Sequence, residues 1–181
     1  MAQNDSAVLQ QWLADEARVL EGVAAGAGMA PISREELSAL PGQAVFDAIF
    51  AGRLPVAPIA QTLDFIGIRI EAGLAIFQGQ PLHRHYNPLG SVHGGWFATM
   101  LDSALGCAVH SQLPAGKAYT TLEFKVNLVR ALTADVPRVR AEGKVIHMGG
   151  QTATAQARLV GPDGRLYAHA NTTCLIFNAR G

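Results

Sequence analysis

A single carboxylate, Asp102, lies within an apolar segment whose composition predicts a buried helix. The segment, about Gly95 to Gln112, is apolar on nearly all sides, and it contains the only carboxylate between Glu71 and Glu123. Burying an unpaired ionised carboxylate costs several kcal/mol, so such a group needs a partner or a chemical role. Two interpretations follow: a structural Asp bonded to a backbone amide, or a catalytic carboxylate.

Small residues surround Asp102 on the expected helix. Gly95, Ala98 and Thr99 lie seven, four and three residues before it, and Gly106 lies four after it. Residues at such spacings share one face of a helix. That face therefore leaves room for another molecule to approach the carboxylate.

The tripeptide His93-Gly94-Gly95 opens the same segment. The first N–H groups of a helix have no partners within it, the helix dipole is positive there, and glycine lets a ligand come close to the backbone. These properties suit an anion or a developing oxyanion. Two glycines also open helices for reasons of backbone geometry alone, and this alternative stays open.

Helix geometry separates the two groups. The nine-residue step from His93 to Asp102 is a rotation of about 900° and a rise of about 13.5 Å, so they lie on opposite faces. The two cannot serve one reacting centre within a single chain. A catalytic role for both requires a second subunit, with antiparallel helices bringing Asp102 of one chain to His93-Gly94 of the other.

The rest of the chain after about residue 60 predicts strands. Apolar and polar residues alternate with a period of two, which indicates a half-exposed antiparallel sheet, and a Gly-containing turn at 71–73 predicts a hairpin. The expected strands are 65–70, 74–77, 120–128, 138–145, 152–159 and 166–177. One apolar helix among six strands predicts an α+β fold in which the sheet wraps around one long central helix.

The residues before this domain predict a helical extension in two parts. Residues 1–30 form a flexible segment with a possible helix at 6–21, followed by a Gly/Ala-rich connector. Residues 31–58 contain two short helices: Ser33 and Glu36 have the spacing of a capping box, and a second helix at 43–50 ends at Gly52. The main domain is then 59–181.

Composition excludes several classes of function. The chain of 181 residues is 49% hydrophobic with 14 basic and 14 acidic residues, so it builds a core and lacks the positive charge of a nucleic-acid binder. No apolar stretch reaches about 18 residues and no secretory signal opens the chain, so we expect a cytoplasmic protein that makes no membrane contact. Its low charge suggests that some surface is buried against another subunit.

Cysteines and histidines do not predict a metal site. Cys107 and Cys174 lie far apart and match neither a disulfide framework nor a zinc site. His83, His85 and His93 invite a metal interpretation, but no Cys or carboxylate lies near them in the sequence. We therefore expect no metal.

The residues around Asp102 resemble a known signature. The run from Asn87 through His93-Gly94-Gly95 to Asp102 resembles that of PaaI-like hotdog-fold acyl-CoA thioesterases, in which an Asn lies six residues before the His-Gly-Gly and an Asp nine after it. The runs 121–130, 149–153, 164–168 and 173–176 resemble the later strands of this family. The resemblance covers about residues 60–178.

The resemblance implies a role for each matching residue. Asp102 would be the nucleophile or general base, and the Gly94 N–H would polarise the thioester carbonyl. Asn87 would hold the water or the carbonyl, His93 would orient the substrate or the loop, and Thr121 would help to position the water. Further residues implied at the substrate are Gly95, Thr120, Gly149, Gly150 and Gln151, with Thr120 competing with Thr121 because neighbouring strand residues face opposite sides.

The resemblance also implies an assembly and leaves points open. It implies a homodimer, usually within a dimer of dimers, with coenzyme A along the dimer interface and no metal or redox cofactor. Gln151 stands where many relatives carry a basic residue for the coenzyme A phosphates; Arg130, Arg138 or Lys144 could replace it. The N-terminal extension is longer than in minimal relatives, and it would either cap the acyl pocket or pack on the outer sheet.

The sequence therefore predicts an acyl-CoA thioesterase that releases free acid and coenzyme A. Two alternatives remain: a hotdog hydratase or dehydratase, in which a His paired with a carboxylate abstracts a proton, and a non-catalytic acyl-CoA-binding dimer. The acyl group stays open among aryl, short-chain and medium-chain thioesters.

Overall fold

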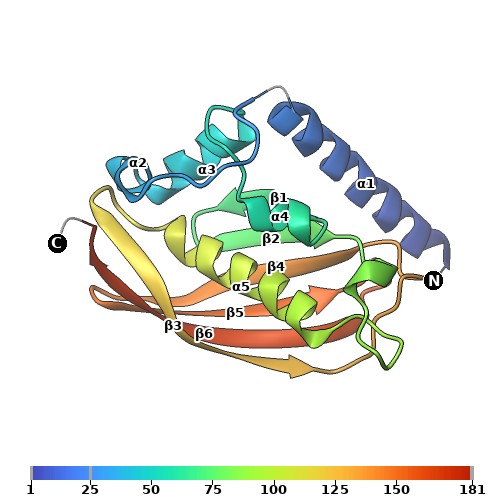
Figure 1. Ribbon diagram of the computed structural model, residues 1–181. Helices are drawn as coiled ribbons and strands as arrows, with labels where there is room; N and C mark the ends of the chain where they lie inside the picture. Colours follow the sequence, from blue (N-terminus) through green and yellow to red (C-terminus); the bar gives the residue numbers. More distant parts are fainter. Residues whose placement is uncertain (1, 25, 180–181) are drawn as a thin grey trace.

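Six antiparallel strands form one sheet that curves around the long helix α5 in the computed structural model, which describes residues 2–24 and 26–179 (Figure 1). The strands are β1 (Phe65–Glu71), β2 (Leu74–Gly79), β3 (Lys117–Leu128), β4 (Val139–Met148), β5 (Thr152–Val160) and β6 (Leu166–Asn178). The helices are α1 (Ala2–Ala24), α2 (Arg34–Ala39), α3 (Gly42–Phe50), α4 (Pro58–Thr62), the 3-10 turn η1 (His83–His85) and α5 (Gly94–His110). The spatial order β1-β2-β4-β5-β6-β3 confirms the predicted α+β hotdog fold.

Helix α5 forms the centre of the core because nearly all its sides carry apolar residues. Met100, Leu101 and Leu105 are completely buried against the concave face of the sheet. At Gly143 of β4 a Cβ atom would lie 2.3 Å from the Ala104 carbonyl oxygen, so glycine is what allows the helix backbone to approach the sheet this closely. The sheet thereby fixes the rotation of α5 about its own axis and decides which of its residues stay accessible.

Strand β3 departs from the half-buried pattern expected of the sheet. It is an edge strand, paired only with β6, and its register shifts between Thr121 and Glu123. Its apolar side chains are largely exposed: Leu122 by 58%, Leu128 by 57% and Phe124 by 36%. Long apolar edge strands are sites of pairing with another chain.

The N-terminal segment is more ordered than the sequence predicts. Helix α1 continues through Gly22 to Ala24, where a flexible connector was expected, and the prediction is wrong here. The chain after it is held by long-range backbone bonds: Ala27 N–H donates to Gly52 O at 2.8 Å, and Val56 N–H donates to Gly28 O at 2.9 Å. Local composition cannot reveal such bonds, because their partners lie about 25 residues away. Among the described residues, no helix is long and apolar enough to cross a membrane.

The two short helices of the extension form where expected. The Ser33 hydroxyl accepts from Glu36 N–H at 3.1 Å, and the Glu36 carboxylate accepts from Ser33 N–H at 3.1 Å, which confirms the capping box. The sequence does not predict helix α4, which begins at Pro58, the expected domain boundary. Proline suits the first position of a helix. The division at residues 30 and 58 stays a prediction.

Arg140 on β4 fastens helix α1 to the sheet. Its guanidinium donates to Asp15 at 2.9 Å and to Gln78 at 2.8 Å, and it lies 4.6 Å from the centre of the Trp12 ring. The hydrogen bond from Arg140 lowers the pKa of Asp15, which favours the charged pair. The charged side chain of Arg140, which lies between α1 and the sheet, therefore adds to the apolar contacts that hold this helix.

Replacing Arg140 with alanine should lower the free energy of unfolding by about 2 kcal/mol, because losing one partner of a buried polar pair costs about 1–3 kcal/mol. Urea denaturation at neutral pH measures this loss.

The matched control is Arg158→Ala, which removes an exposed pair with Glu142 on the same sheet. This change should cost at most about 0.5 kcal/mol. Equal losses in the two variants would show that Arg140 does not fasten α1.

Candidate active site

Asp102 lies half-buried in the middle of α5, where it faces the start of β3. The Thr121 hydroxyl donates to its Oδ1 atom at 3.4 Å. Burial raises the pKa of Asp102, and the Thr121 hydrogen bond lowers it by a smaller amount. A carboxylate with a raised pKa is a stronger base than an ordinary Asp, which suits a general base or a nucleophile.

The strand register decides between the two neighbouring threonines. Thr121 turns toward α5 and is half-buried, whereas Thr120 is exposed on the other side of β3. Thr120 therefore does not reach Asp102 within the chain. Its expected role at the substrate stays a prediction.

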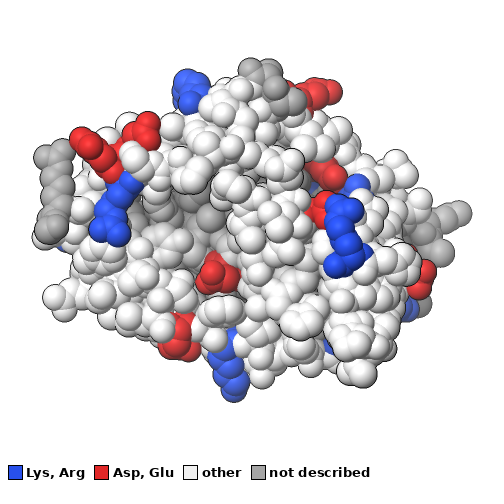
Figure 2. Space-filling view, viewed as in Figure 1, with Lys and Arg blue, Asp and Glu red and all other residues white. Residues whose placement is uncertain are grey.

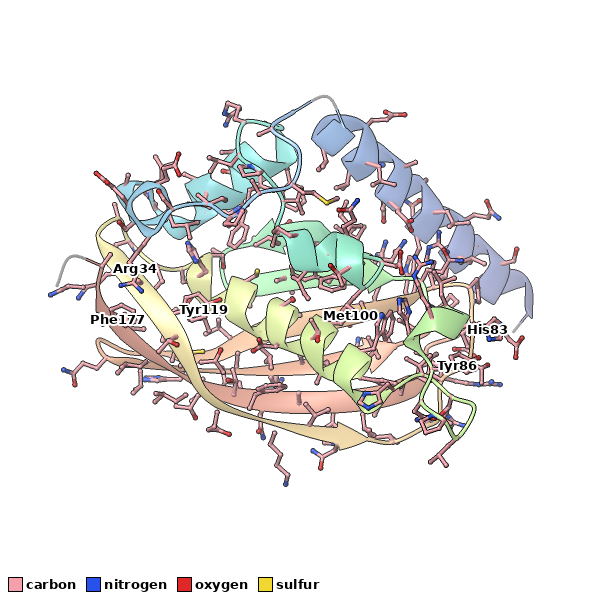
Figure 3. The ribbon with its side chains drawn as sticks, viewed as in Figure 1. Arg34, His83, Tyr86, Met100, Tyr119 and Phe177 are labelled. Carbon is pink, nitrogen blue, oxygen red and sulfur yellow. The ribbon has the colours of Figure 1, made fainter. Side chains whose placement is uncertain are left out.

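A cavity of about 300 Å³ opens beside Asp102, between α5, β1 and the N-terminal helices. Figure 2 shows a hollow on this face, with acidic atoms inside it. Ser103, Cys107 and Tyr119 line the same end of the cavity as Asp102, and Tyr119 lies beside the last turns of α5 in Figure 3. Burial raises the pKa of the Cys107 thiol to about 12, so this cysteine is a neutral wall residue and not a nucleophile.

The first turn of α5 holds the second group of expected site residues. His93 is the N-cap, and its Nδ1 accepts from Gly95 N–H at 2.9 Å. The Gly95 amide is thus occupied, and the expectation that it binds substrate is not supported. Among the described residues no group accepts from Gly94 N–H, so this amide is the donor that the helix start offers.

Asn87 shapes the loop before the helix. Its Oδ1 accepts from Leu89 N–H at 2.8 Å and from Ser91 N–H at 3.4 Å, which closes the turn between η1 and α5. His93 N–H donates to His85 O at 2.8 Å, and this bond ties the same loop to η1. Asn87 therefore positions the helix start, and its contact with water or carbonyl stays a prediction.

The structure divides the predicted site residues into three groups. Asp102 and Thr121 lie together. Asn87, His93 and Gly94 lie together at the first turn of α5, about 12 Å before Asp102 along the helix axis. The turn Gly149-Gly150-Gln151 lies between β4 and β5, at the sheet end where β3 begins, and Gln151 O accepts from Ile176 N–H at 2.8 Å. One chain therefore does not bring the first two groups to one centre.

One proposed phosphate ligand is already paired. Arg138 donates to Glu16 of α1 at 2.7 Å and is 16% exposed, so its guanidinium is engaged within the chain, and its contact with coenzyme A phosphates stays a prediction. The sequence could not show this, because the partner lies 122 residues earlier in the chain. Arg130 and Lys144 are exposed.

The histidines of the loop have other partners than a metal. The His85 Nε2 atom lies 2.8 Å from Asp64, its Nδ1 accepts from Leu82 N–H at 3.2 Å, and its ring stacks on Trp96. Sequence reasoning missed Asp64 because it is distant along the chain. Within residues 2–24 and 26–179, no cluster of three His, Cys, Asp or Glu could hold a metal ion.

Comparisons with known proteins agree with this architecture. Residues 89–168 match the family model of the thioesterase superfamily. "Putative esterase VNG_1336C" of Halobacterium salinarum is 32% identical over 108 residues, which are 55% of this chain and 70% of the relative. The chain belongs to the thioesterase superfamily. It is therefore a thioester hydrolase by family.

Solved structures of thioesterases share the hotdog fold. A mutant of the phenylacetic acid degradation protein PaaI from Thermus thermophilus matches with a TM-score of 0.59 and 25% identity, over 65% of this chain and 97% of that one. A hypothetical thioesterase from Streptococcus pneumoniae, solved with coenzyme A, matches with a TM-score of 0.58 and 22% identity, over 65% of this chain and 89% of that one. The predicted PaaI-like hotdog fold is confirmed. These matches leave about a third of this thioesterase uncovered.

Replacing Thr121 with valine should raise the pKa of Asp102 further above its ordinary value. The hydroxyl donates to the ionised carboxylate and so lowers this pKa, and valine keeps the shape without the donor. An NMR titration that follows the Asp102 carboxyl carbon measures the change.

Thr120→Val is the matched control, since this side chain faces away from Asp102. It should leave the titration of Asp102 unchanged. If Thr121→Val also left it unchanged, the contact would not act on the carboxylate.

Proposed function

We propose that this protein hydrolyses a coenzyme A thioester to a free acid and coenzyme A, with Asp102 as the general base or nucleophile. The observation that carries this proposal is the position of Asp102, a carboxylate with a raised pKa at the polar end of an apolar cavity. Such an arrangement places an apolar acyl group in the cavity and its thioester carbonyl beside the carboxylate.

The reaction needs only groups that the chain carries. With Asp102 as the base, its carboxylate takes a proton from water while the water oxygen bonds to the thioester carbon. With Asp102 as the nucleophile, its oxygen bonds to that carbon first, and water then hydrolyses the anhydride. In both cases the carbonyl oxygen becomes an oxyanion, the carbon–sulfur bond breaks, and the thiolate takes up a proton. Thr121 holds the carboxylate from β3.

The Gly94 amide is the proposed donor to the oxyanion. It is the first N–H of α5, where the helix dipole is positive, and the His93 cap leaves it free by bonding to Gly95 instead. Asp102 lies eight residues further along the same helix, about 12 Å away. The donor must therefore come from a neighbouring subunit.

A symmetric dimer through β3 would supply this donor. The exposed edge of β3, with Leu122, Phe124 and Leu128, suits pairing with a second copy, and a two-fold axis makes the paired strands antiparallel. Helix α5 packs beside β3 and leaves small residues accessible along one side, among them Gly94, Ala98 and Thr99. Two such helices can run antiparallel at close distance.

Coenzyme A would lie along the same interface. The thioesterase from Streptococcus pneumoniae, with this fold, was solved with coenzyme A. The turn Gly149-Gly150-Gln151 offers backbone groups at the sheet end where β3 begins, and Arg130 and Lys144 are exposed cations that could bind the phosphates. We extend the proposal to a dimer of dimers in the cytoplasm.

The hydratase alternative fits the site less well. It needs a histidine and a carboxylate at one centre, but His93 uses its Nδ1 to cap α5 and lies on the opposite face of the helix from Asp102. A non-catalytic acyl-CoA-binding dimer makes the same contacts without turnover. Catalytic assays separate this alternative from the hydrolase.

Replacing Asp102 with asparagine should lower kcat for thiol release from acyl-CoA by about 100-fold to 10,000-fold, the range for a lost general base. A thiol-specific dye follows the reaction. The matched control is Asp47→Asn, which changes an exposed carboxylate on α3 and should keep kcat within about twofold of the wild type. Unchanged turnover in the Asp102 variant would contradict its catalytic role, and a wild type that hydrolyses no acyl-CoA would favour the binding module.

Replacing Gly94 with proline removes the proposed oxyanion donor without breaking the helix. Proline suits the first helical position, and His93 already has the extended backbone that precedes proline, with φ −63° and ψ 138°. We expect kcat to fall by about 100-fold to 1,000-fold. Gly94→Ala retains the N–H and is the control; its Cβ meets only the mobile end of Leu128, so most of the activity should remain.

Mixing the two inactive variants tests whether the site is shared. A heterodimer of Asp102→Asn with Gly94→Pro has one site with both mutations and one site with neither. Random pairing therefore restores roughly a quarter of the wild-type activity, in thiol release after co-refolding. If no activity returns while both variants fold and pair, the donor and the carboxylate do not come from different subunits.

A further inference from the structure

We infer that the N-terminal helices α1 and α3 and the segment 56–60 form the wall of the acyl pocket, and that this wall limits the substrate to a neutral, apolar acyl group of medium size, aliphatic or aryl. This inference rests on the proposed thioesterase function, and it names the substrate class of that same site. It rests on the lining, the charge and the volume of the cavity beside Asp102.

The N-terminal extension supplies a large part of the cavity wall. Val19 and Val23 come from α1, and Ile49 and Phe50 come from α3. Segment 56–60 adds further apolar residues, and the remaining wall comes from β1, β2, α5 and β3. The extension lies over the end of the curved sheet that holds β1 and β2 (Figure 1), so it closes a space that the hotdog domain alone would leave open.

The cavity has one polar end. Among the described residues that line the cavity, Asp102 is the only charged one, and the polar residues Ser103, Cys107 and Tyr119 come with it from α5 and β3. All the lining residues contributed by α1, α3 and β1 are apolar or glycine. A second carboxylate carried on the far end of an acyl chain would be buried there without a partner, which is unfavourable. The wall therefore selects neutral acyl groups.

The volume of the cavity sets the size of its occupant. A water molecule takes about 30 Å³ of liquid, so a cavity of about 300 Å³ holds on the order of ten atoms of that size. An octanoyl or phenylacetyl group is of this size, whereas a palmitoyl group is much larger and an acetyl group leaves most of the apolar wall uncovered.

A second cavity adjoins the first. It has a volume of about 250 Å³ and shares lining residues with it, among them Val23, Val56 and Ala60. Its lining also includes the carboxylates Glu16 and Asp64. A longer apolar chain that extended into it would meet charged groups, which is unfavourable.

The extension is fastened firmly enough to act as a wall. Arg140 of β4 and Arg138, which directly precedes this strand, donate to Asp15 and Glu16 of α1, one turn before Val19. Both carboxylates are largely covered, with 20% of their side chains exposed. Helix α1 thus holds a constant distance from the sheet, which a size-selective pocket requires.

The test compares the hydrolysis of acetyl-, octanoyl-, phenylacetyl-, succinyl- and palmitoyl-CoA by wild type and wall variants. The wild type should prefer the octanoyl and phenylacetyl thioesters over the other three by about tenfold or more in kcat/KM, since each methylene in a pocket is worth about tenfold or more. Ile49→Trp, which fills the cavity from α3, should lower kcat/KM for octanoyl-CoA by about tenfold or more and leave acetyl-CoA within about twofold. Ile49→Ala should shift the preference toward longer chains.

The control is Leu40→Trp, which adds the same side chain at an exposed position outside the cavity. It should keep the wild-type preference. An unchanged preference in both Ile49 variants, with turnover intact, would overturn the inference while leaving the thioesterase proposal standing.

Binding separates failure of the pocket from failure of catalysis. Calorimetric titration of the Asp102→Asn variant should show tighter binding of octanoyl-CoA than of acetyl-CoA, and Ile49→Trp in the same background should abolish the difference. A wild type without turnover but with this binding difference would refute hydrolysis and support the pocket. Equal binding of the two thioesters by the Asp102→Asn variant would refute the pocket.

Discussion

Burial of α5 in the concave sheet is the constraint on which the rest of the structure depends. The helix is apolar on nearly all sides, so the sheet can cover most of it, and Gly143 allows the two backbones to approach closely. Only one side of the helix remains accessible, and that side carries small residues together with Asp102. The same packing that stabilises the core thus places one carboxylate where it is partly desolvated, and its pKa rises as a direct consequence.

The same constraint explains why the site is incomplete in one chain. An α-helix has a fixed rise and rotation per residue, so its first amide and its ninth residue cannot meet. The Asn87 turn and the His93 cap hold the helix start that carries the Gly94 amide. Thr121 holds the Asp102 carboxylate. Strand β3 supports Asp102 from one side and exposes apolar residues at the sheet edge on the other. Catalysis and assembly are therefore coupled through one strand in the proposed mechanism.

The N-terminal extension forms part of the wall of the cavity beside Asp102. The PaaI mutant and the Streptococcus pneumoniae thioesterase each cover 65% of the chain. The helices of the extension contribute apolar side chains to the cavity beside Asp102, and the cationic side chains of Arg138 and Arg140 hold α1 in place. Variation in such an extension can change the acyl group without changing the catalytic residues, because the wall and the carboxylate belong to different parts of the chain.

The sequence by itself determined the features that depend on near neighbours. The period-two strands, the apolar helix, the Ser33–Glu36 capping box and the spacing from His93 to Asp102 are local patterns, and each led to a correct element or a necessary geometric conclusion. Local patterns carry this information because backbone hydrogen bonds and helix periodicity act over a few residues.

The tertiary structure alone decided which side chains meet over long distances. It turned Thr121 rather than Thr120 toward Asp102, since a bulge and the pairing with β6 set the orientation of β3. It paired Arg138 with Glu16 and His85 with Asp64. It also holds the chain after α1 in place through backbone hydrogen bonds to residues 52–56. These contacts join residues that are 19 to 122 positions apart, and only the folded packing of sheet, helix and extension brings them within bonding distance.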